Sequence, residues 1–135
     1  MLFRSAVRAV LIESSGKVFC SGADLSEATS EGMEVGARRI VDLQRLIVTL
    51  EKPVVTKNLG AVRAGGIGIV AAADIAVSAD DATFALTEVK LGLAAAIISL
   101  TVHHRMNPRA ASLTDRKSTR LNSSHSQQSR MPSSA

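Results

Sequence analysis

The chain has 135 residues, enough for one domain with a core of its own. It contains no Trp or Tyr and only three Phe, so we expect a core of Ala, Val, Ile and Leu. Most of the formal charge of +4 lies in residues 115–135, which argues against a nucleic-acid partner for the nearly neutral remainder. The single cysteine and the absence of a long apolar run favour a cytoplasmic protein without a membrane span or signal peptide.

Short apolar runs alternate with helical patterns along the chain. The β-rich runs predict extended segments at residues 7–12, 54–58, 75–78 and 83–85, while residues 18–20 are read only as a return to apolar surroundings before a glycine turn. The continuous apolar run 9–12 further predicts a strand buried on both faces. Helical periods predict helices at 34–50, 67–73 and through 97–100, the first of them ended by Pro53. Together these patterns predict an α/β fold with a mostly parallel core.

Two glycine-marked turns, at residues 20–24 and 63–68, each follow an extended run and lead into a segment that can be helical. Glycine lets a ligand oxygen approach the main chain closely and allows a positive φ. A helix N-terminus adds unpaired N–H groups and the positive end of a dipole. We therefore interpret the two turns as the halves of one anion-stabilising site.

Several polar residues near these turns have plain structural interpretations. Asp24 stands three positions before Glu27, a spacing that favours a helix N-cap over proton donation. Cys20 has no cationic neighbour and favours packing over nucleophilic chemistry. The pair His103 and His104 lies near a helix end without Cys or acidic partners at ligand spacing, so no metal site is predicted.

Glycines at 65, 66 and 68 also suit close helix–sheet packing, since the sequence has neither a P-loop Lys-Ser/Thr pair nor the GxGxxG order of dinucleotide sites. Residues 113–135 are rich in Ser and Arg and have no hydrophobic period, which predicts disorder. We therefore expect one partial domain at 1–112 and a disordered tail at 113–135.

Three ordered motifs resemble the crotonase superfamily, the enoyl-CoA hydratases and isomerases. They are Gly16–Leu25 (GKVFCSGADL), Gly60–Gly68 (GAVRAGGIG) and Phe84–Gly92 (FALTEVKLG). The resemblance covers residues 4–112 and implies a ClpP/crotonase-like spiral of strand-strand-helix units. It implies an acyl-CoA substrate, with coenzyme A as part of that substrate and no separate cofactor.

The resemblance also assigns roles by position. The backbone N–H groups of Ala23 and Gly65 become the oxyanion hole for a thioester carbonyl. The coenzyme A segment becomes Ala23, Asp24, Leu25 and Ser26, together with Gly65. Glu88 becomes the acid/base, although an isolated acid after a short strand is ordinarily a solvated turn residue. For Arg63 two assignments stay open, contact with a coenzyme A phosphate and exposure to solvent.

The sequence departs from the family pattern at Gly68, where hydratases carry the first of two glutamates. With Glu88 alone, double-bond isomerisation is still possible, whereas addition of water requires another group to bind the water, so the choice between hydratase and isomerase stays open. Family members are also longer, and the tail at 115–125 resembles a translated sequencing-adapter read-through, so a truncated chain with a non-native end is expected. The family implies a homo-trimer or hexamer for the full-length protein. The alternative is an incompetent fragment that keeps only part of the fold.

Overall fold

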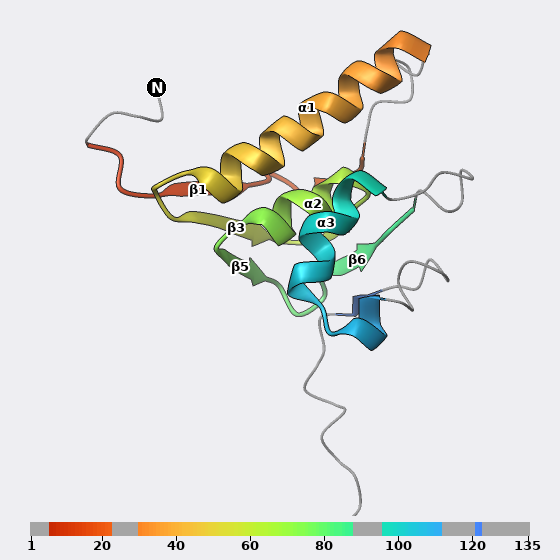
Figure 1. Ribbon diagram of the computed structural model, residues 1–135. Coiled ribbons are helices and arrows are strands. Elements are labelled where there is room, and N and C mark those ends of the chain that lie inside the picture. Colours follow the sequence, from red (N-terminus) through yellow and green to blue (C-terminus); the bar gives the residue numbers. More distant parts are fainter. Residues whose placement is uncertain (1–5, 23–29, 88–95, 112–120, 123–135) are drawn as a thin grey trace, which may run out of the picture.

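The computed structural model describes residues 6–22, 30–87, 96–111 and 121–122 (Figure 1). Its helices and strands follow the order that the sequence predicts, with two further short strands, Val18–Cys20 and Ala61–Arg63, that the residue patterns did not predict. Their bounds are β1 Val10–Glu13, β2 Val18–Cys20, α1 Ser30–Thr49, β3 Val54–Asn58, β4 Ala61–Arg63, α2 Gly65–Ala72, β5 Ile75–Ser78, β6 Thr83–Ala85, α3 Ala96–Arg105 and β7 Leu121–Asn122.

Successive strands go to two different sheets. β1, β3 and β5 form one parallel sheet in that order, and β2, β4 and β6 form a second parallel run, with β7 added antiparallel at its edge. Each turn of the chain therefore supplies one strand to each sheet and then a helix. The predicted α/β fold of repeated strand-strand-helix units is confirmed.

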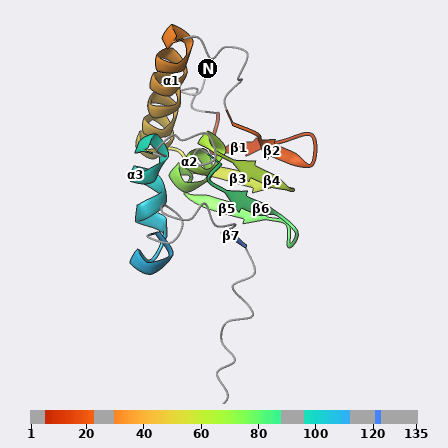
Figure 2. The same cartoon turned by 90° about the vertical axis from the view of Figure 1, so that its right-hand side faces the viewer.

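The three helices lie together on one side of the strands (Figure 2). α1 packs against α2 and α3, and α2 packs against α3. The buried residues beneath them form two aliphatic clusters. One cluster contains Val62, Ile67, Leu86, Ile98 and Val102, and the other contains Ile47, Val54, Ala72 and Ala73. The aliphatic core expected from the composition is confirmed. No helix in these described ranges is long and apolar enough to cross a bilayer.

α1 is longer at its start than the periodicity predicts, beginning at Ser30 instead of residue 34. Gly32 and Gly36 interrupt the apolar pattern in the first half of α1, and Gly is a poor helix former. The sequence pattern therefore did not predict the first helical turn, which begins at Ser30. The helix ends at Thr49, ahead of Pro53 as expected. Its buried face carries Ile40, Leu43 and Ile47, the predicted stripe, against the rest of the core.

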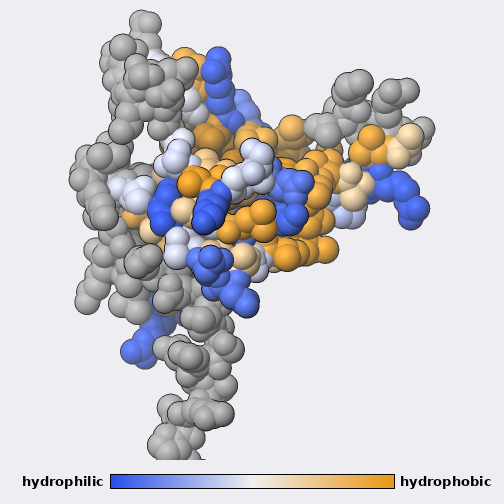
Figure 3. Space-filling view, turned by 180° about the vertical axis from the view of Figure 1, so that it is seen from behind, coloured by the Kyte–Doolittle hydropathy of each residue, from blue (hydrophilic) through white to orange (hydrophobic). Residues whose placement is uncertain are grey.

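β1 differs from its prediction in both place and burial. It spans Val10–Glu13 instead of 7–12, and Leu11 is 57% exposed. Leu11 pairs with Val55, which pairs with Ile75, so the three stand in one row across the sheet. The helices cover only the opposite face, and Ile75 and Val77 are also more than half exposed. Figure 3, seen from the side away from the helices, shows hydrophobic surface there.

The tail predicted as disordered contains one described piece. Leu121–Asn122 forms β7, with Phe84 paired to Leu121 and Thr83 paired to Asn122. These two residues have backbone partners because the edge of β6 offers unpaired backbone groups to an extended segment. The remaining tail residues lie outside the described ranges, where disorder stays a prediction.

Candidate functional site

The turn after β2 and the turn after β4 meet at one edge of the second sheet. β2 and β4 are parallel neighbours, with Val18 opposite Ala61 and Cys20 opposite Val62, so their carboxyl ends coincide. Gly22 has a φ of +111°, and a Cβ placed on it would stand 3.1 Å from the Cβ of Ala64. The two glycine-marked stretches, separated by some forty positions in the sequence, are thus in contact.

A second contact ties the same turns together. A Cβ placed on Gly66 would stand 2.5 Å from Cys20 Cβ and 3.1 Å from Cys20 Sγ. Real Cβ atoms do not approach this closely, so only glycine allows α2 to lie against the end of β2. Cys20 is half-buried in this contact, which agrees with its predicted packing role.

The N-terminus of α2 points its free amides to this edge. The helix opens at Gly65, and its N-cap Ala64 makes no side-chain capping bond and has a φ of +47° and a ψ of −126°. The Ile67 N–H donates to the Ala64 carbonyl at 2.9 Å. The first N–H groups of a helix have no acceptor inside it, and the first turn of α2 contains no acidic residue. This end of the helix therefore favours an anion or a developing oxyanion.

Of the residues predicted to touch substrate, Gly65 is described and lies at this helix start. The placements of Ala23, Asp24, Leu25 and Ser26, and of Glu88, lie outside the described residues. Their roles, and the N-cap role of Asp24, therefore stay predictions. What the structure brings together is Gly22, the last described residue before Ala23, and Ala64, the residue before Gly65.

Gly68, one turn further along α2, is buried in a tight contact. A Cβ placed on it would stand 2.7 Å from Ile98 Cγ2 and 3.0 Å from both Cδ and Oε1 of Gln44. Gln44 Oε1 accepts a 2.7 Å hydrogen bond from the Thr101 hydroxyl, and Gln44 Nε2 donates to the Ile40 carbonyl at 3.3 Å. Sequence reasoning missed Gln44. The signal that could have identified it is that Gln44 is polar, whereas Ile40, Leu43 and Ile47 on the same inner face of α1 are apolar.

Arg63, for which the sequence left contact with a phosphate or with solvent open, donates hydrogen bonds to the neighbouring strand β6. Nη1 donates to the Thr83 carbonyl at 2.6 Å and Nη2 donates to Thr83 Oγ1 at 2.9 Å. These bonds link β4 to β6 and hold the strand that leads into Gly65. His103 and His104 are exposed at the end of α3, as predicted. The described residues hold no group of three His, Cys, Asp or Glu side chains that could bind a metal ion.

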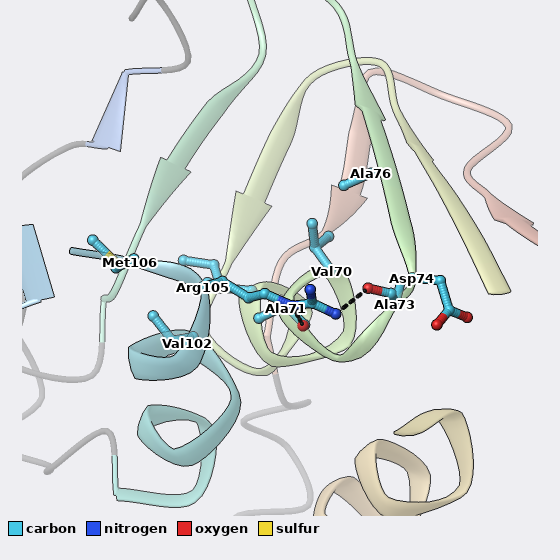
Figure 4. Close-up of a pocket in the computed structure, with 9 residues that line it drawn as sticks. Val70, Ala71, Ala73, Asp74, Ala76, Val102, Arg105 and Met106 are labelled. Carbon is cyan, nitrogen blue, oxygen red and sulfur yellow. Dashed lines mark hydrogen bonds between the residues drawn. The ribbon is translucent and has the colours of Figure 1, made fainter. Parts of the chain in front are cut away.

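A pocket of about 310 Å³ lies at the opposite end of α2, between α2, α3 and β5. Its lining is mainly apolar, with Arg105 and Asp74 as its charged members (Figure 4). Arg105 donates from Nε to the Ala71 carbonyl and from Nη2 to the Ala73 carbonyl, each at 3.0 Å. Because Arg105 satisfies carbonyls at the C-terminal end of α2, its position is explained by helix capping. The pocket is separate from the edge where the glycine turns meet.

Comparison with known proteins finds a family over the part of the chain that holds the three motifs. The family model for enoyl-CoA hydratase/isomerase matches residues 3–118. A Thermus thermophilus protein assigned as an enoyl-CoA hydratase is 37% identical over 111 residues, covering 78% of this chain and 44% of that protein. The mitochondrial Delta(3,5)-Delta(2,4)-dienoyl-CoA isomerase of Mus musculus is 37% identical over 110 residues, covering 71% of this chain and 34% of its own length.

A solved structure from Legionella pneumophila, assigned as an enoyl-CoA hydratase/isomerase (crotonase), superposes with a TM-score of 0.82 at 31% identity. The superposition covers 90% of this chain and 49% of that one. The crotonase-like fold expected from the motifs is confirmed. The chain spans less than half the length of these relatives.

Proposed function

The chain belongs to the enoyl-CoA hydratase/isomerase family, and from this we propose that it binds an acyl-CoA thioester and stabilises the enolate formed from it. The N–H groups of Ala23 and Gly65 hold the thioester oxygen, and coenzyme A lies along residues 23–26. Glu88 carries the proton. The observation that supports this best is the contact between Gly22 and Ala64, because these residues directly precede the two proposed donors.

The reaction that we propose is double-bond isomerisation. Glu88 removes a proton from C2 of a 3-enoyl-CoA, the negative charge moves to the thioester oxygen, and the proton returns at C4 to give the 2-enoyl-CoA. Nothing is gained or lost overall, so one carboxylate suffices. Addition of water would need a group that positions and deprotonates it, and Gly68 has no side chain to do so. Relatives of this chain include proteins named as hydratases and as isomerases.

The two N–H groups carry most of the proposed rate enhancement. Removal of one donor from an oxyanion hole costs about 3–4 kcal/mol, or about 10²–10³ in kcat. The positive φ of Gly22 and the tight packing of Gly66 keep the two turns in place before substrate arrives, so little reorganisation is needed at the moment of reaction.

Coenzyme A is part of the substrate in this proposal, and the assignment requires no separate cofactor. We propose a cytoplasmic protein that, at full length, forms a homo-trimer or hexamer like its family. The second candidate is an incompetent fragment. It is favoured by the length comparison, since this chain spans 44% of its Thermus thermophilus relative and the remainder can supply walls of the pocket.

The experiment incubates the purified chain with a 3-enoyl-CoA and, separately, with crotonyl-CoA, and follows the absorbance of the conjugated thioester. We expect absorbance to rise with the 3-enoyl-CoA and turnover to fall by about 10²–10⁴ in Glu88→Gln. Glu51→Gln, at an exposed position outside the site, is the matched control and keeps full activity. A flat trace from the folded chain supports the fragment, and equal rates in the two variants remove Glu88 from the mechanism.

A further inference from the structure

α2 presents glycine to α1 at two positions one turn apart. A Cβ placed on Gly65 would stand 3.4 Å from Ile40 Cδ1, and one placed on Gly68 would stand 3.0 Å from Gln44 and 2.7 Å from Ile98 Cγ2 of α3. Ile40 and Gln44 are themselves one turn apart on α1, so the two helices meet along matched rows. The glycines of α2 leave space between the helices, and side chains of α1 fill it, joined beside Gly68 by Ile98 of α3.

The room beside Gly68 adjoins the thioester site of the proposed function. Residues three apart on a helix share a face, so position 68 lies behind Gly65 on the same side of α2. Each Cα–Cβ bond also tilts toward the helix N-terminus, so a side chain at 68 would lean toward the free amide of Gly65. If the Gly65 N–H holds the thioester oxygen, as the proposed function has it, a group at position 68 would lie near the bound thioester.

Gln44 occupies this room as a fixed, neutral group. It is 4% exposed, although its neighbours on the inner face of α1 are apolar. Its carboxamide oxygen accepts from Thr101 at 2.7 Å, and its nitrogen donates to its own helix at 3.3 Å. A buried carboxamide with satisfied hydrogen bonds neither takes up a proton nor offers space to a water molecule.

We propose that Gln44, held by Thr101, determines the reaction of the site by filling the room beside Gly68. With that room closed, neither a second carboxylate nor a water molecule stands beside the substrate, and Glu88 works alone. Gln44 is thus a specificity-determining residue that touches no substrate. This inference rests on the proposed function and explains how the chain restricts it to isomerisation.

The test uses the full chain with Gly68→Glu, Gln44→Ala and the two combined. Arg45→Ala, which changes an exposed neighbour of Gln44 on the same helix, is combined with Gly68→Glu as the matched control. Two quantities are measured for each variant. They are the melting temperature, and the ratio of the rates of crotonyl-CoA hydration and 3-enoyl-CoA isomerisation.

We expect Gly68→Glu alone to lower the melting temperature by about 10 °C or more, because its Cβ meets Gln44 and Ile98. Gln44→Ala should restore at least half of this loss, since Ile98 can then move into the vacated space, whereas Arg45→Ala should restore none. The Gly68→Glu, Gln44→Ala chain should raise the hydration-to-isomerisation ratio by about tenfold or more.

The inference is overturned if Gly68→Glu alone keeps the wild-type melting temperature, or if the combined variant is stable and its ratio stays at the wild-type value. Failure of the proposed function looks different. In that case no variant turns over either thioester. The melting temperatures of the single and combined variants still show whether Gln44 fills the space beside Gly68.

Discussion

Gly66 offers a direct test of how the two glycine turns are held together, because it is the residue on which α2 approaches β2. In Gly66→Ala the new methyl group would stand 2.5 Å from Cys20 Cβ. Carbon atoms in favourable contact are about 3.5–4.0 Å apart, so the two elements must separate by about 1 Å. Cys20 Cβ is attached directly to the β2 backbone, and rotation of a side chain cannot relieve the contact.

The expected loss of stability follows from two opposing terms. Overpacking of this kind costs about 1–3 kcal/mol, and replacing Gly by Ala in a helix returns at most about 1 kcal/mol. We therefore expect Gly66→Ala to lower the free energy of unfolding by about 1–2 kcal/mol, which corresponds to a fall in melting temperature of about 4–16 °C for a domain of this size.

The assay is thermal unfolding followed by circular dichroism, with Gly36→Ala as the matched control. Gly36 lies in α1, and a Cβ placed on it meets nothing within 4 Å, so this change should raise stability by up to about 1 kcal/mol. Adding Cys20→Gly to Gly66→Ala should recover part of the loss, since it removes the opposing Cβ. Equal effects of Gly66→Ala and Gly36→Ala would refute the contact and, with it, the juxtaposition of the turns.

Three further changes test other parts of the structure. Ala64→Gly should raise the free energy of unfolding by about 1 kcal/mol in urea titrations, because Ala64 holds a φ of +47° and a ψ of −126° that an alanine adopts only under strain; a loss of stability would contradict that backbone geometry. Arg105→Lys should cost about 1 kcal/mol, since an ammonium cannot reach the Ala71 and Ala73 carbonyls with the same fork, whereas Arg109→Lys, at an exposed position, should change nothing measurable. Lys57→Met should change stability by less than about 1 kcal/mol, because the Lys57–Glu13 ion pair is nearly half exposed; a larger loss would mean that the pair is shielded from water.

The sequence predicts the architecture well where glycine and proline mark the ends of elements. Pro53 separates α1 from β3, and the glycine turns mark the places where β2 and β4 end, so these boundaries and the meeting of the turns follow from local chemistry. The positions that correspond to the family motifs could also be assigned from the sequence, because each of the three motifs is an unbroken run of residues.

Other features depend on contacts between distant residues and left weak local signals. β4 is three residues long, between Gly60 and the turn at Ala64, too short for an alternating pattern, and it exists because β2 and β6 pair with it on both sides. The apolar run 9–12 predicts that Leu11 is buried, but Leu11 is exposed because no helix covers its face of the sheet. The role of Gln44 depends on Thr101 and Gly68 from two other helices, which no period within α1 encodes.

The way strands are shared between the two sheets has a consequence for folding kinetics. Val10 must find Val54, and Val18 must find Ala61, before either pair gains a ladder hydrogen bond. No strand of the two parallel runs can form a hairpin with its successor, so every early pairing requires closure of a long loop. Such high contact order predicts slow folding, and a refolding rate well below that of a helical bundle of equal length should be measurable by stopped-flow fluorescence of a reporter introduced on the exposed face of α1.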